Sequence, residues 1–397
     1  MQPVEIKKDI YWVGAIDWNI RDFHGYSTPK GTTYNAFLVK DDKITLFDVV
    51  KKPFKDDLVQ NVKRLGVEKL DYLVVNHVEM DHSGALPEVI EVLRPERIVC
   101  SPAGKKALMD HYHREDWPFE VVETGQELSL GKRTLQFLET RMLHWPDSMM
   151  SYIEEDRLLI SSDGFGQHWA TSERFDDEVN QEELLAHAAK YYANILLLFS
   201  PLVQKLIAKV QELGLQIDMI APDHGLIWRS DPGRIIQAYN SWSLQESREK
   251  ALIIYDTMWQ STEKMAFAIA EGLNQEGAAF KLLNLKLNHR SDIMTEVLDA
   301  KAIVFGSSTI NNGMMPSMAD VLCYMKGLRP IGKLGVAFGS YGWSGEAVKH
   351  ITDVLTEMKF KVLNGGLRVR FAPTPEDLEK CVDLGRQIGK EVKRAKV

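Results

Sequence analysis

The chain has 397 residues, which is more than one ordinary hydrophobic core accommodates and predicts two domains. Hydrophobic residues make up 45% and charged residues 26%, as in soluble globular proteins, and a net charge of −8 without a basic tract argues against nucleic acid as a partner. Three widely spaced cysteines argue against a disulfide framework and a rubredoxin-type module inside the chain, and without a signal peptide or a bilayer-spanning apolar run we expect a cytoplasmic protein that is not bound to a membrane.

Residues 1–249 are predicted to form the first domain, which combines short apolar strands with amphipathic helices. Strands are expected at residues 10–14, 34–40, 43–49, 70–75, 97–101, 134–138, 149–153, 157–161 and 216–220. Helices are expected at residues 54–65, 85–93 and 103–112. These elements indicate an α/β domain.

Several of these strands run into polar loops that carry histidine or carboxylate side chains. The richest loop follows the strand at residues 70–75 and places two imidazoles and two carboxylates within six residues. Together the loops offer seven donor side chains: His77, Glu79, Asp81, His82, His144, Asp163 and His224. Because loops at strand ends bring together side chains that are distant in sequence, we expect these donors to meet at one site.

Imidazole and carboxylate groups are ligands of divalent metals. Seven donors exceed the needs of one metal and fit two metals that share a carboxylate. The alternative is a set of ordinary polar loop residues, which is the favoured interpretation of His144 or His224 taken alone. The dense loop and the recurring pattern of donors after strands favour the metal interpretation.

The pattern His77-x-Glu79-x-Asp81-His82 resembles the metallo-β-lactamase fold in its flavodiiron branch, and His144, Asp163 and His224 complete the resemblance. It implies an N-terminal metallo-β-lactamase-like αββα sandwich. Most of that superfamily has histidine where this chain has Glu79, and a hard carboxylate oxygen favours iron over zinc. The resemblance implies an oxygen-bridged pair of iron ions with these ligands: His77, Glu79 and His144 on one iron, Asp81, His82 and His224 on the other, and Asp163 between them.

Two further residues, His24 and Tyr192, match positions that resemble the second layer around the family's irons. They are candidate catalytic residues, which would supply protons or hydrogen bonds to a bound diatomic molecule. For Tyr192 the alternative is an aromatic residue in the core of a helix.

Residues 250–397 are predicted to form the second domain, in which strands and helices alternate. Strands are expected at residues 251–255, 280–285, 302–305 and 335–338, and helices at residues 263–273, 293–298, 318–325 and 346–355. Such alternation indicates a doubly wound parallel sheet with helices on both faces.

Three loops at the carboxyl ends of these strands are rich in hydroxyl, amide, glycine and aromatic residues. Parallel sheets bind ligands at this edge, and a helix N-terminus binds phosphate without basic side chains. The loops match neither a Walker A motif nor a Gly-x-Gly-x-x-Gly fingerprint, and they resemble flavodoxin, which implies FMN as the ligand. The candidate FMN-binding residues are Thr257, Met258, Trp259, Ser261, Thr262, Ser307, Ser308, Thr309, Asn311, Asn312, Gly313, Ser340, Tyr341, Gly342, Trp343, Ser344 and Gly345.

The resemblance to flavodiiron proteins covers essentially the whole chain, and it implies a reductase. In such a protein, electrons pass from rubredoxin or a similar small redox protein through FMN to the di-iron centre, which reduces O2 to water, NO to N2O, or both. The resemblance also implies a head-to-tail homodimer, or a dimer of such dimers. Two alternatives are a zinc-dependent hydrolase fused to an electron-transfer flavodoxin module, and an electron carrier whose metal site is structural or empty.

Overall fold

The computed structural model describes residues 1–394, and its contacts divide the chain into two compact units. Unit 1 contains residues 1–24, 28–191 and 201–240, and unit 2 contains residues 25–27, 192–200 and the described chain from residue 241 onward. The boundary predicted near residue 249 falls at the start of the first strand of the unit 2 sheet, β17 (Arg248–Tyr255). Two short segments that precede this strand by many residues, 25–27 and 192–200, therefore belong to unit 2.

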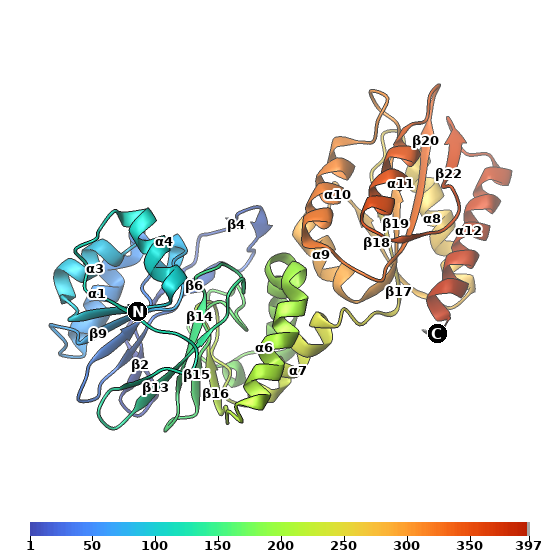
Figure 1. The fold of residues 1–397 in the computed structure, drawn as a ribbon. Coiled ribbons are helices and arrows are strands. Elements are labelled where there is room, and N and C mark those ends of the chain that lie inside the picture. The colour runs from blue at the N-terminus through green and yellow to red at the C-terminus, as the bar shows by residue number, and fades with distance from the viewer. Residues whose placement is uncertain (395–397) are drawn as a thin grey trace. The chain divides into compact units, whose positions relative to one another are not determined.

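Unit 1 is built on two β-sheets (Figure 1). The larger sheet has the order β1 (Val4–Lys7), β2 (Ile10–Trp12), β7 (Phe37–Val39), β8 (Thr45–Phe47), β9 (Tyr72–Val75), β10 (Arg97–Cys100) and β11 (Phe119–Val121). The smaller sheet has the order β12 (Glu127–Ser129), β13 (Thr134–Glu139), β14 (Met149–Ile153), β15 (Leu158–Ile160) and β16 (Met219–Ala221). The strands from β8 to β11 are parallel to one another, and so are β15 and β16.

Alternating side chains of the larger sheet enter two separate cores. Phe37, Phe47 and Val74 point toward the smaller sheet and pack in one apolar cluster with its side chains, among them Phe137 and Ile160. Their sequence neighbours Leu38, Leu46 and Leu73 enter the second cluster, on the opposite face of the sheet. This cluster also contains buried side chains of α1 (Lys55–Arg64), α3 (Leu86–Leu93) and α4 (Pro102–Tyr112). This period of two places helices outside one sheet and a second sheet against its other face.

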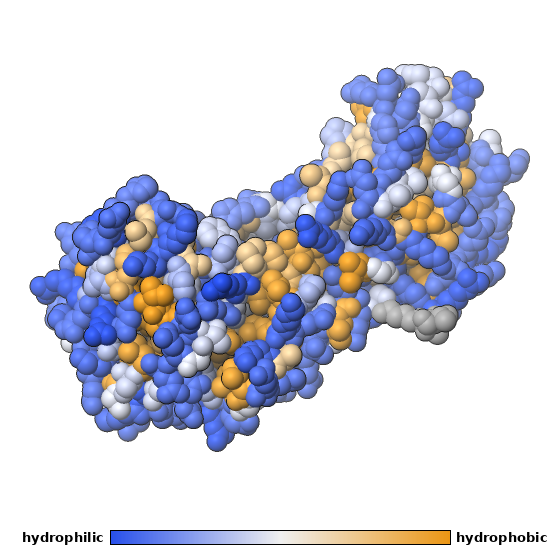
Figure 2. Space-filling view, viewed as in Figure 1, coloured by the Kyte–Doolittle hydropathy of each residue, from blue (hydrophilic) through white to orange (hydrophobic). Residues whose placement is uncertain are grey.

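The outer face of the smaller sheet is covered by α6 (Ser200–Glu212) and α7 (Pro232–Ser243). Together with the helices outside the larger sheet, they complete an αββα sandwich, so the predicted fold of the first domain is confirmed. Apolar side chains of both helices line a hollow of about 400 Å³ above the strands. Figure 2 shows hydrophobic side chains at the surface over α6.

The last strand of unit 1 differs from its prediction. The expected strand at residues 216–220 forms only as β16, because the residues before it make other contacts. The Gln216 carbonyl accepts a hydrogen bond from the Tyr152 hydroxyl at 2.6 Å, and the Asp218 amide donates to the Arg157 carbonyl at 2.9 Å.

One helical stretch, Gln181–Glu212, is long and apolar enough by length and composition to cross a membrane. It includes α5 (Gln181–Tyr191), the π-helical turn Tyr192–Leu196, a short 3-10 turn and α6. Core helices of soluble proteins pass the same test, and α5 carries buried residues. The stretch is therefore weak support for a membrane segment.

Unit 2 has a parallel sheet of order β18 (Ala279–Asn284), β17, β19 (Ala300–Gly306), β20 (Leu334–Tyr341) and β21 (Lys361–Val362), and β22 (Leu367–Arg370) also pairs with β20. The helices are α8 (Ser261–Gln275), α9 (Arg290–Asp299), α10 (Pro316–Leu328), α11 (Ala347–Glu357) and α12 (Pro375–Lys393). Figure 1 shows α8 and α12 on one face and the other three helices on the opposite face. The doubly wound sheet predicted for the second domain is confirmed.

Helix α8 is held close to α12 by two glycines. A Cβ atom on Gly272 would lie 2.0 Å from the Val382 carbonyl oxygen, and one on Gly385 would lie 2.1 Å from the Ile269 carbonyl oxygen. Only glycine permits backbones to approach this closely. The contact fixes α8, whose first turn faces the ligand-binding edge of the sheet.

Candidate metal centre and ligand cavity

The loop after β9 is shaped by a buried carboxylate on the neighbouring strand end. Asp48 accepts hydrogen bonds from the amides of Asn76 and His77 at 2.8 and 3.3 Å and from the Asn76 side chain at 2.8 Å. The next residues form the single helical turn α2 (Met80–Ser83), with Glu79 at its N-cap. The loop therefore leaves the sheet in a fixed direction.

The first group of donors consists of His77, Glu79, His144 and Asp163. The Glu79 Oε2 atom lies 3.3 Å from His77 Nε2 and 3.1 Å from His144 Nε2. The Asp163 Oδ2 atom lies 2.9 Å from His144 Nε2 and 3.5 Å from His77 Nε2. A metal bonded at about 2.1 Å keeps neighbouring ligand atoms about 3 Å apart, so this spacing fits one ion.

The second group consists of Asp81, His82 and His224. The Asp81 Oδ2 atom lies 3.4 Å from His82 Nε2 and 3.2 Å from His224 Nε2. The other oxygen of Asp163, Oδ1, lies 3.2 Å from His82 Nε2 and 3.5 Å from His224 Nε2. Each oxygen of Asp163 thus faces a different group, which is the geometry that a bridging carboxylate requires. The structure brings all seven predicted donors together.

Several donor atoms around the second group are buried and make no hydrogen bond within the described chain. Both oxygens of Asp81, both ring nitrogens of His82 and Oδ1 of Asp163 are buried without a hydrogen-bond partner in the described chain, although they lie close together. Buried polar atoms without partners are costly, and a metal satisfies them. The residues therefore fit two metal ions with mixed nitrogen and oxygen ligands.

Residues outside the predicted set orient the histidine rings. Asp147 Oδ2 lies 3.0 Å from His77 Nδ1 and accepts a hydrogen bond from the Val78 amide at 2.7 Å. His224 Nδ1 lies 2.7 Å from the Thr33 carbonyl oxygen, which leaves Nε2 for the metal. The hydrogen bonds at His77 and His224 fix the tautomer of a metal-bound histidine. The Asp223 carboxylate lies 3.8 Å from His82 Nδ1, beyond hydrogen-bond distance.

The surroundings of the donors shift several pKa values. Burial alone would raise the pKa of Asp147, but the hydrogen bond from His77 more than offsets it and the pKa is lowered. Burial alone would lower the pKa of His144, but the Asp163 and Glu79 carboxylates raise it to about 9. Asp223 is buried near Asp48 and its pKa is raised well above the usual range. The negative potential of the carboxylates therefore favours a cation between them.

The two predicted second-layer residues have different surroundings. His24 Nε2 lies 3.5 Å from Glu79 Oε1, beside the donors. The Tyr192 hydroxyl forms a hydrogen bond with Ser200 Oγ at 2.9 Å, and the preceding Tyr191 is the tyrosine beside Asp163. Burial and the Asp163 carboxylate raise the pKa of Tyr191 well above its usual range. The geometry thus favours Tyr191 over Tyr192 as the tyrosine of the metal centre.

One histidine that the sequence reasoning missed also lies at the centre. His168 is buried, its Nδ1 atom lies 2.8 Å from Thr32 Oγ1, and its ring centroid lies 4.8 Å from that of His224. Burial and the neighbouring His224 lower its pKa well below the usual range, which keeps the ring neutral. Its position five residues after Asp163 was the available signal.

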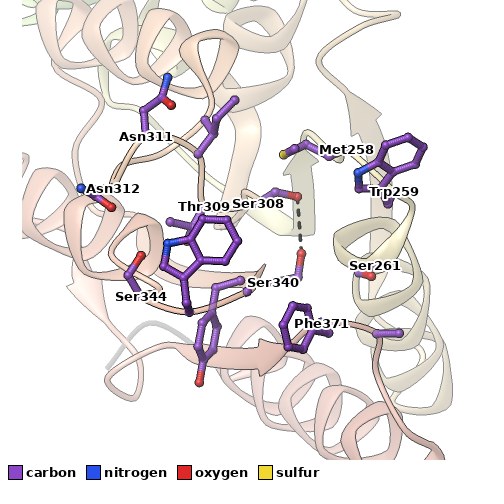
Figure 3. Close-up of a pocket in the computed structure, with 15 residues that line it drawn as sticks. Met258, Trp259, Ser261, Ser308, Thr309, Asn311, Asn312, Ser340, Ser344 and Phe371 are labelled. Atoms are coloured by element: carbon purple, nitrogen blue, oxygen red, sulfur yellow. Dashed lines mark hydrogen bonds between the residues drawn. The ribbon is translucent and has the colours of Figure 1, made fainter.

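Unit 2 contains a cavity of about 810 Å³ at the carboxyl edge of its sheet. Figure 3 shows Met258 and Trp259 on one side of it and Asn311 and Asn312 on the other. Twelve of the predicted residues line it: Met258, Trp259, Ser261, Ser308, Thr309, Asn311, Asn312, Ser340, Tyr341, Gly342, Trp343 and Ser344. Ile310, Phe371 and Ala372 also line it and were not predicted. The cavity therefore draws on all three predicted loops.

Five of the predicted residues do not line the cavity: Thr257, Thr262, Ser307, Gly313 and Gly345. Two of them support it from behind. Thr262 Oγ1 lies 3.0 Å from Ser308 Oγ and 2.9 Å from Ser340 Oγ, and Ser307 Oγ accepts a hydrogen bond from the Met315 amide at 2.9 Å.

The first turn of α8 fits a phosphate group. Its N-cap residue, Gln260, has a φ of 65° and makes no side-chain capping bond, so the first backbone N–H groups of the helix are available to an anion. The buried Oγ1 of Thr257 has no hydrogen-bond partner in the described chain. Because no charged side chain among residues 1–394 lines the cavity, the helix terminus and hydroxyl groups would carry phosphate recognition.

Both units match known protein families. Residues 32–225 match the model of the ODP family β-lactamases, and residues 253–385 match the flavodoxin model. The chain is 49% identical to a nitric oxide reductase of Moorella thermoacetica, over 98% of this chain and 99% of that protein. It is 46% identical to the rubredoxin-oxygen oxidoreductase of Megalodesulfovibrio gigas, over 99% of each chain.

Solved structures agree over the same length. The rubredoxin oxygen:oxidoreductase from Desulfovibrio gigas matches with a TM-score of 0.97 and 46% identity, over 99% of each chain. The flavodiiron protein from Giardia intestinalis matches with a TM-score of 0.96 and 36% identity, over 99% of this chain and 97% of that one. The likeness therefore extends across both units.

Proposed function

Because this chain belongs to the flavodiiron family, we propose that it takes electrons from an external redox protein through FMN to a di-iron centre and reduces a diatomic gas. The substrates are O2, which takes four electrons and four protons to give two waters, and NO, of which two molecules take two electrons and two protons to give N2O and one water. When bound, two ferrous ions and a reduced flavin would supply the electrons for this chemistry.

The observation that carries the proposal is the carboxylate content of the metal centre. Glu79, Asp81 and Asp163 contribute oxygen atoms to the two donor groups. These hard, charged ligands favour iron, including its oxidised state, over zinc. A zinc-dependent hydrolase is therefore the second candidate, and the flavin cavity of unit 2 has no use in simple hydrolysis.

The residues around the two proposed iron sites have distinct roles. Asp147 and the Thr33 carbonyl hold the rings of His77 and His224 with Nε2 directed inward. His24, whose side chain is 77% exposed, is suited to exchange protons with solvent beside Glu79. The raised pKa of Tyr191 keeps its hydroxyl protonated, so this hydroxyl is a hydrogen-bond donor beside Asp163. Substrate protons would thus enter through His24.

Exposed aromatic residues at the flavin cavity support protein partners. Trp259 and Trp343 line the cavity and are 87% and 86% exposed, and Phe371 beside them is 60% exposed. Large exposed apolar groups around a cavity mark a surface for another protein. We propose rubredoxin or a similar small redox protein as the electron donor, and a head-to-tail homodimer, or a dimer of such dimers, in the cytoplasm.

Replacement of one metal ligand tests the function against the electron-carrier alternative. The variant His144→Ala should lose at least about a hundredfold in O2 and NO consumption, because a first-layer ligand is missing, and should retain FMN reduction by the donor. The control is His111→Ala, an exposed histidine on α4, which should leave both properties unchanged. Full gas consumption by His144→Ala would contradict the proposed site.

A further inference from the structure

Asp256 is a buried carboxylate in the loop that joins β17 to α8, next to the first turn that fits a phosphate group. It directly follows the last residue of β17, and it is 3% exposed. It does not line the cavity of unit 2, which in this loop is lined by Met258, Trp259 and Ser261. A buried negative charge beside a site for an anion is unfavourable by itself, so this carboxylate needs partners that offset its charge.

Both oxygen atoms of Asp256 accept hydrogen bonds, from different elements. Oδ1 accepts from the Thr257 amide at 2.7 Å and lies 3.6 Å from Lys286 Nζ. Oδ2 accepts from the hydroxyl group of Ser317, in the first turn of α10. The ammonium group and the N-terminus of α10 offset the charge of the carboxylate. Asp256 therefore ties the loop after β17 to α10 and to the segment after β18.

Lys286 lies in the segment that follows β18, and it is bonded to the same loop. Its Nζ atom donates a hydrogen bond to the Thr257 carbonyl at 2.9 Å. Its backbone is held in place, because its amide donates to Asn284 Oδ1 at 2.9 Å and the preceding Leu285 amide donates to the Tyr255 carbonyl at 2.9 Å. The ammonium group thus reaches the loop from a fixed position outside the cavity lining.

Thr257 is held at both of its backbone polar groups, and its side chain is not. Its amide is bonded to Asp256 and its carbonyl to Lys286. Its Oγ1 atom is buried without a hydrogen-bond partner in the described chain, and the residue is 7% exposed. A buried hydroxyl group without a partner is costly unless a ligand supplies one. The backbone contacts therefore fix a hydroxyl group that is suited to bind a ligand beside the N-terminus of α8.

We propose that Asp256, Lys286 and Ser317 are positioning residues for the phosphate group of FMN, and that they act by fixing Thr257. This inference rests on the proposed function, since FMN is the ligand in both. The three residues do not line the cavity and act through the loop that precedes α8. The aromatic side chains that line the cavity are suited to the flavin ring. Loss of a positioning residue should therefore weaken the binding of the phosphate group and leave the binding of the ring unchanged.

Comparison of FMN with riboflavin, which lacks the phosphate group, tests the inference on the iron-loaded chain after removal of its flavin. Ser317→Ala and Lys286→Met each remove one hydrogen bond, and each should weaken FMN binding about fivefold in a fluorescence titration. Riboflavin affinity should change less than about twofold. The matched control is Lys281→Met, which removes an equal charge from β18, where the lysine bonds to Glu296. It should bind both flavins as the parent does.

A double-mutant cycle separates the positioning of Thr257 from a general effect of charge. Lys286→Met should cause no further loss of FMN affinity in a Thr257→Val background, because the lysine acts through the threonine. Equal losses in the two backgrounds, equal losses of FMN and riboflavin affinity, or parent-like FMN binding by both Ser317→Ala and Lys286→Met would overturn the inference. If the parent protein consumed neither gas, the proposed function would fail, while the two flavin affinities would still decide the inference. A parent protein that bound neither flavin would refute both.

Discussion

The second-layer carboxylate Asp147 offers a quantitative test of how the metal centre is built. A single oxygen, Oδ2, accepts from the Val78 amide at 2.7 Å and lies 3.0 Å from His77 Nδ1. Asp147→Asn can keep an oxygen at that position and removes only the charge. Asp147→Ala removes the acceptor altogether and leaves two buried donors unpaired. The pair of variants therefore separates the charge from the hydrogen bonds.

The expected magnitudes follow from these contacts. A hydrogen bond to a charged group contributes about 1 kcal/mol more than one between neutral groups, so Asp147→Asn should weaken iron binding by about fivefold to tenfold. Asp147→Ala should weaken iron binding by about a hundredfold. This is the upper end of the loss of about tenfold to a hundredfold that is typical when the hydrogen-bond partner of a metal-bound histidine is removed. Both variants leave the seven metal donors in place.

Anaerobic competition with a chelator of known iron affinity measures these losses, and turnover of O2 and NO at saturating iron provides a second readout. The matched control is Glu139→Gln, which removes one acidic charge at the end of β13, where Glu139 pairs with the exposed Arg141. It should bind iron as the parent does. Equal affinities for the parent, Asp147→Asn and Asp147→Ala would refute the argument that Asp147 orients His77.

Four other outcomes are expected. Glu79→His should shift the bound metal from iron toward zinc, as measured by elemental analysis after growth with both metals; unchanged iron loading would contradict the role of the carboxylate. Thr262→Val should weaken FMN binding about tenfold in a flavin-fluorescence titration, because two cavity serines lose their common partner. Burial alone would raise the pKa of Glu296, but hydrogen bonds from Lys250 and Lys281 lower it, so its stabilising effect is present above the unfolded pKa of about 4.3 and is lost as pH falls through the lower folded value. The parent protein should lose unfolding free energy as the pH falls from neutral to acid, and Glu296→Gln should reduce this loss by about 1 kcal/mol. An unchanged pH dependence of the unfolding free energy would argue against the ion pairs of Glu296 with the two lysines. Removal of iron by a chelator should lower the Tm of the transition of unit 1 and leave that of unit 2 unchanged in calorimetry, since the buried donors then lack a partner.

The seven candidate donors could be predicted from the sequence because each follows a strand. Strand β9 belongs to the larger sheet and strands β15 and β16 to the smaller one, and the loops that follow them bring Asp81, Asp163 and His224 together. The cavity of unit 2 followed from the same rule, since the loops that line it come after parallel strands. Apolar periodicity locates strands and helices, and a short donor-rich loop is conspicuous in the sequence.

The residues that the sequence did not reveal depend on tertiary contacts. Asp147 and Asp223 stand three residues after His144 and one residue before His224, and nothing local distinguishes them from solvent-exposed acids until the histidine rings are placed. The choice between Tyr191 and Tyr192 depends on where α5 passes into a π-helical turn, which periodicity does not resolve to one residue.

We propose that this chain carries iron in unit 1 and a flavin in unit 2 and uses both to reduce a gas. The most direct measurement determines iron, zinc and FMN per chain and then follows O2 and NO separately with electrodes after anaerobic reduction. We predict two irons and one FMN, with rapid consumption of at least one gas, and the ratio of the two rates names the preferred substrate. Zinc in place of iron, with neither gas consumed, would contradict the account and favour the hydrolase.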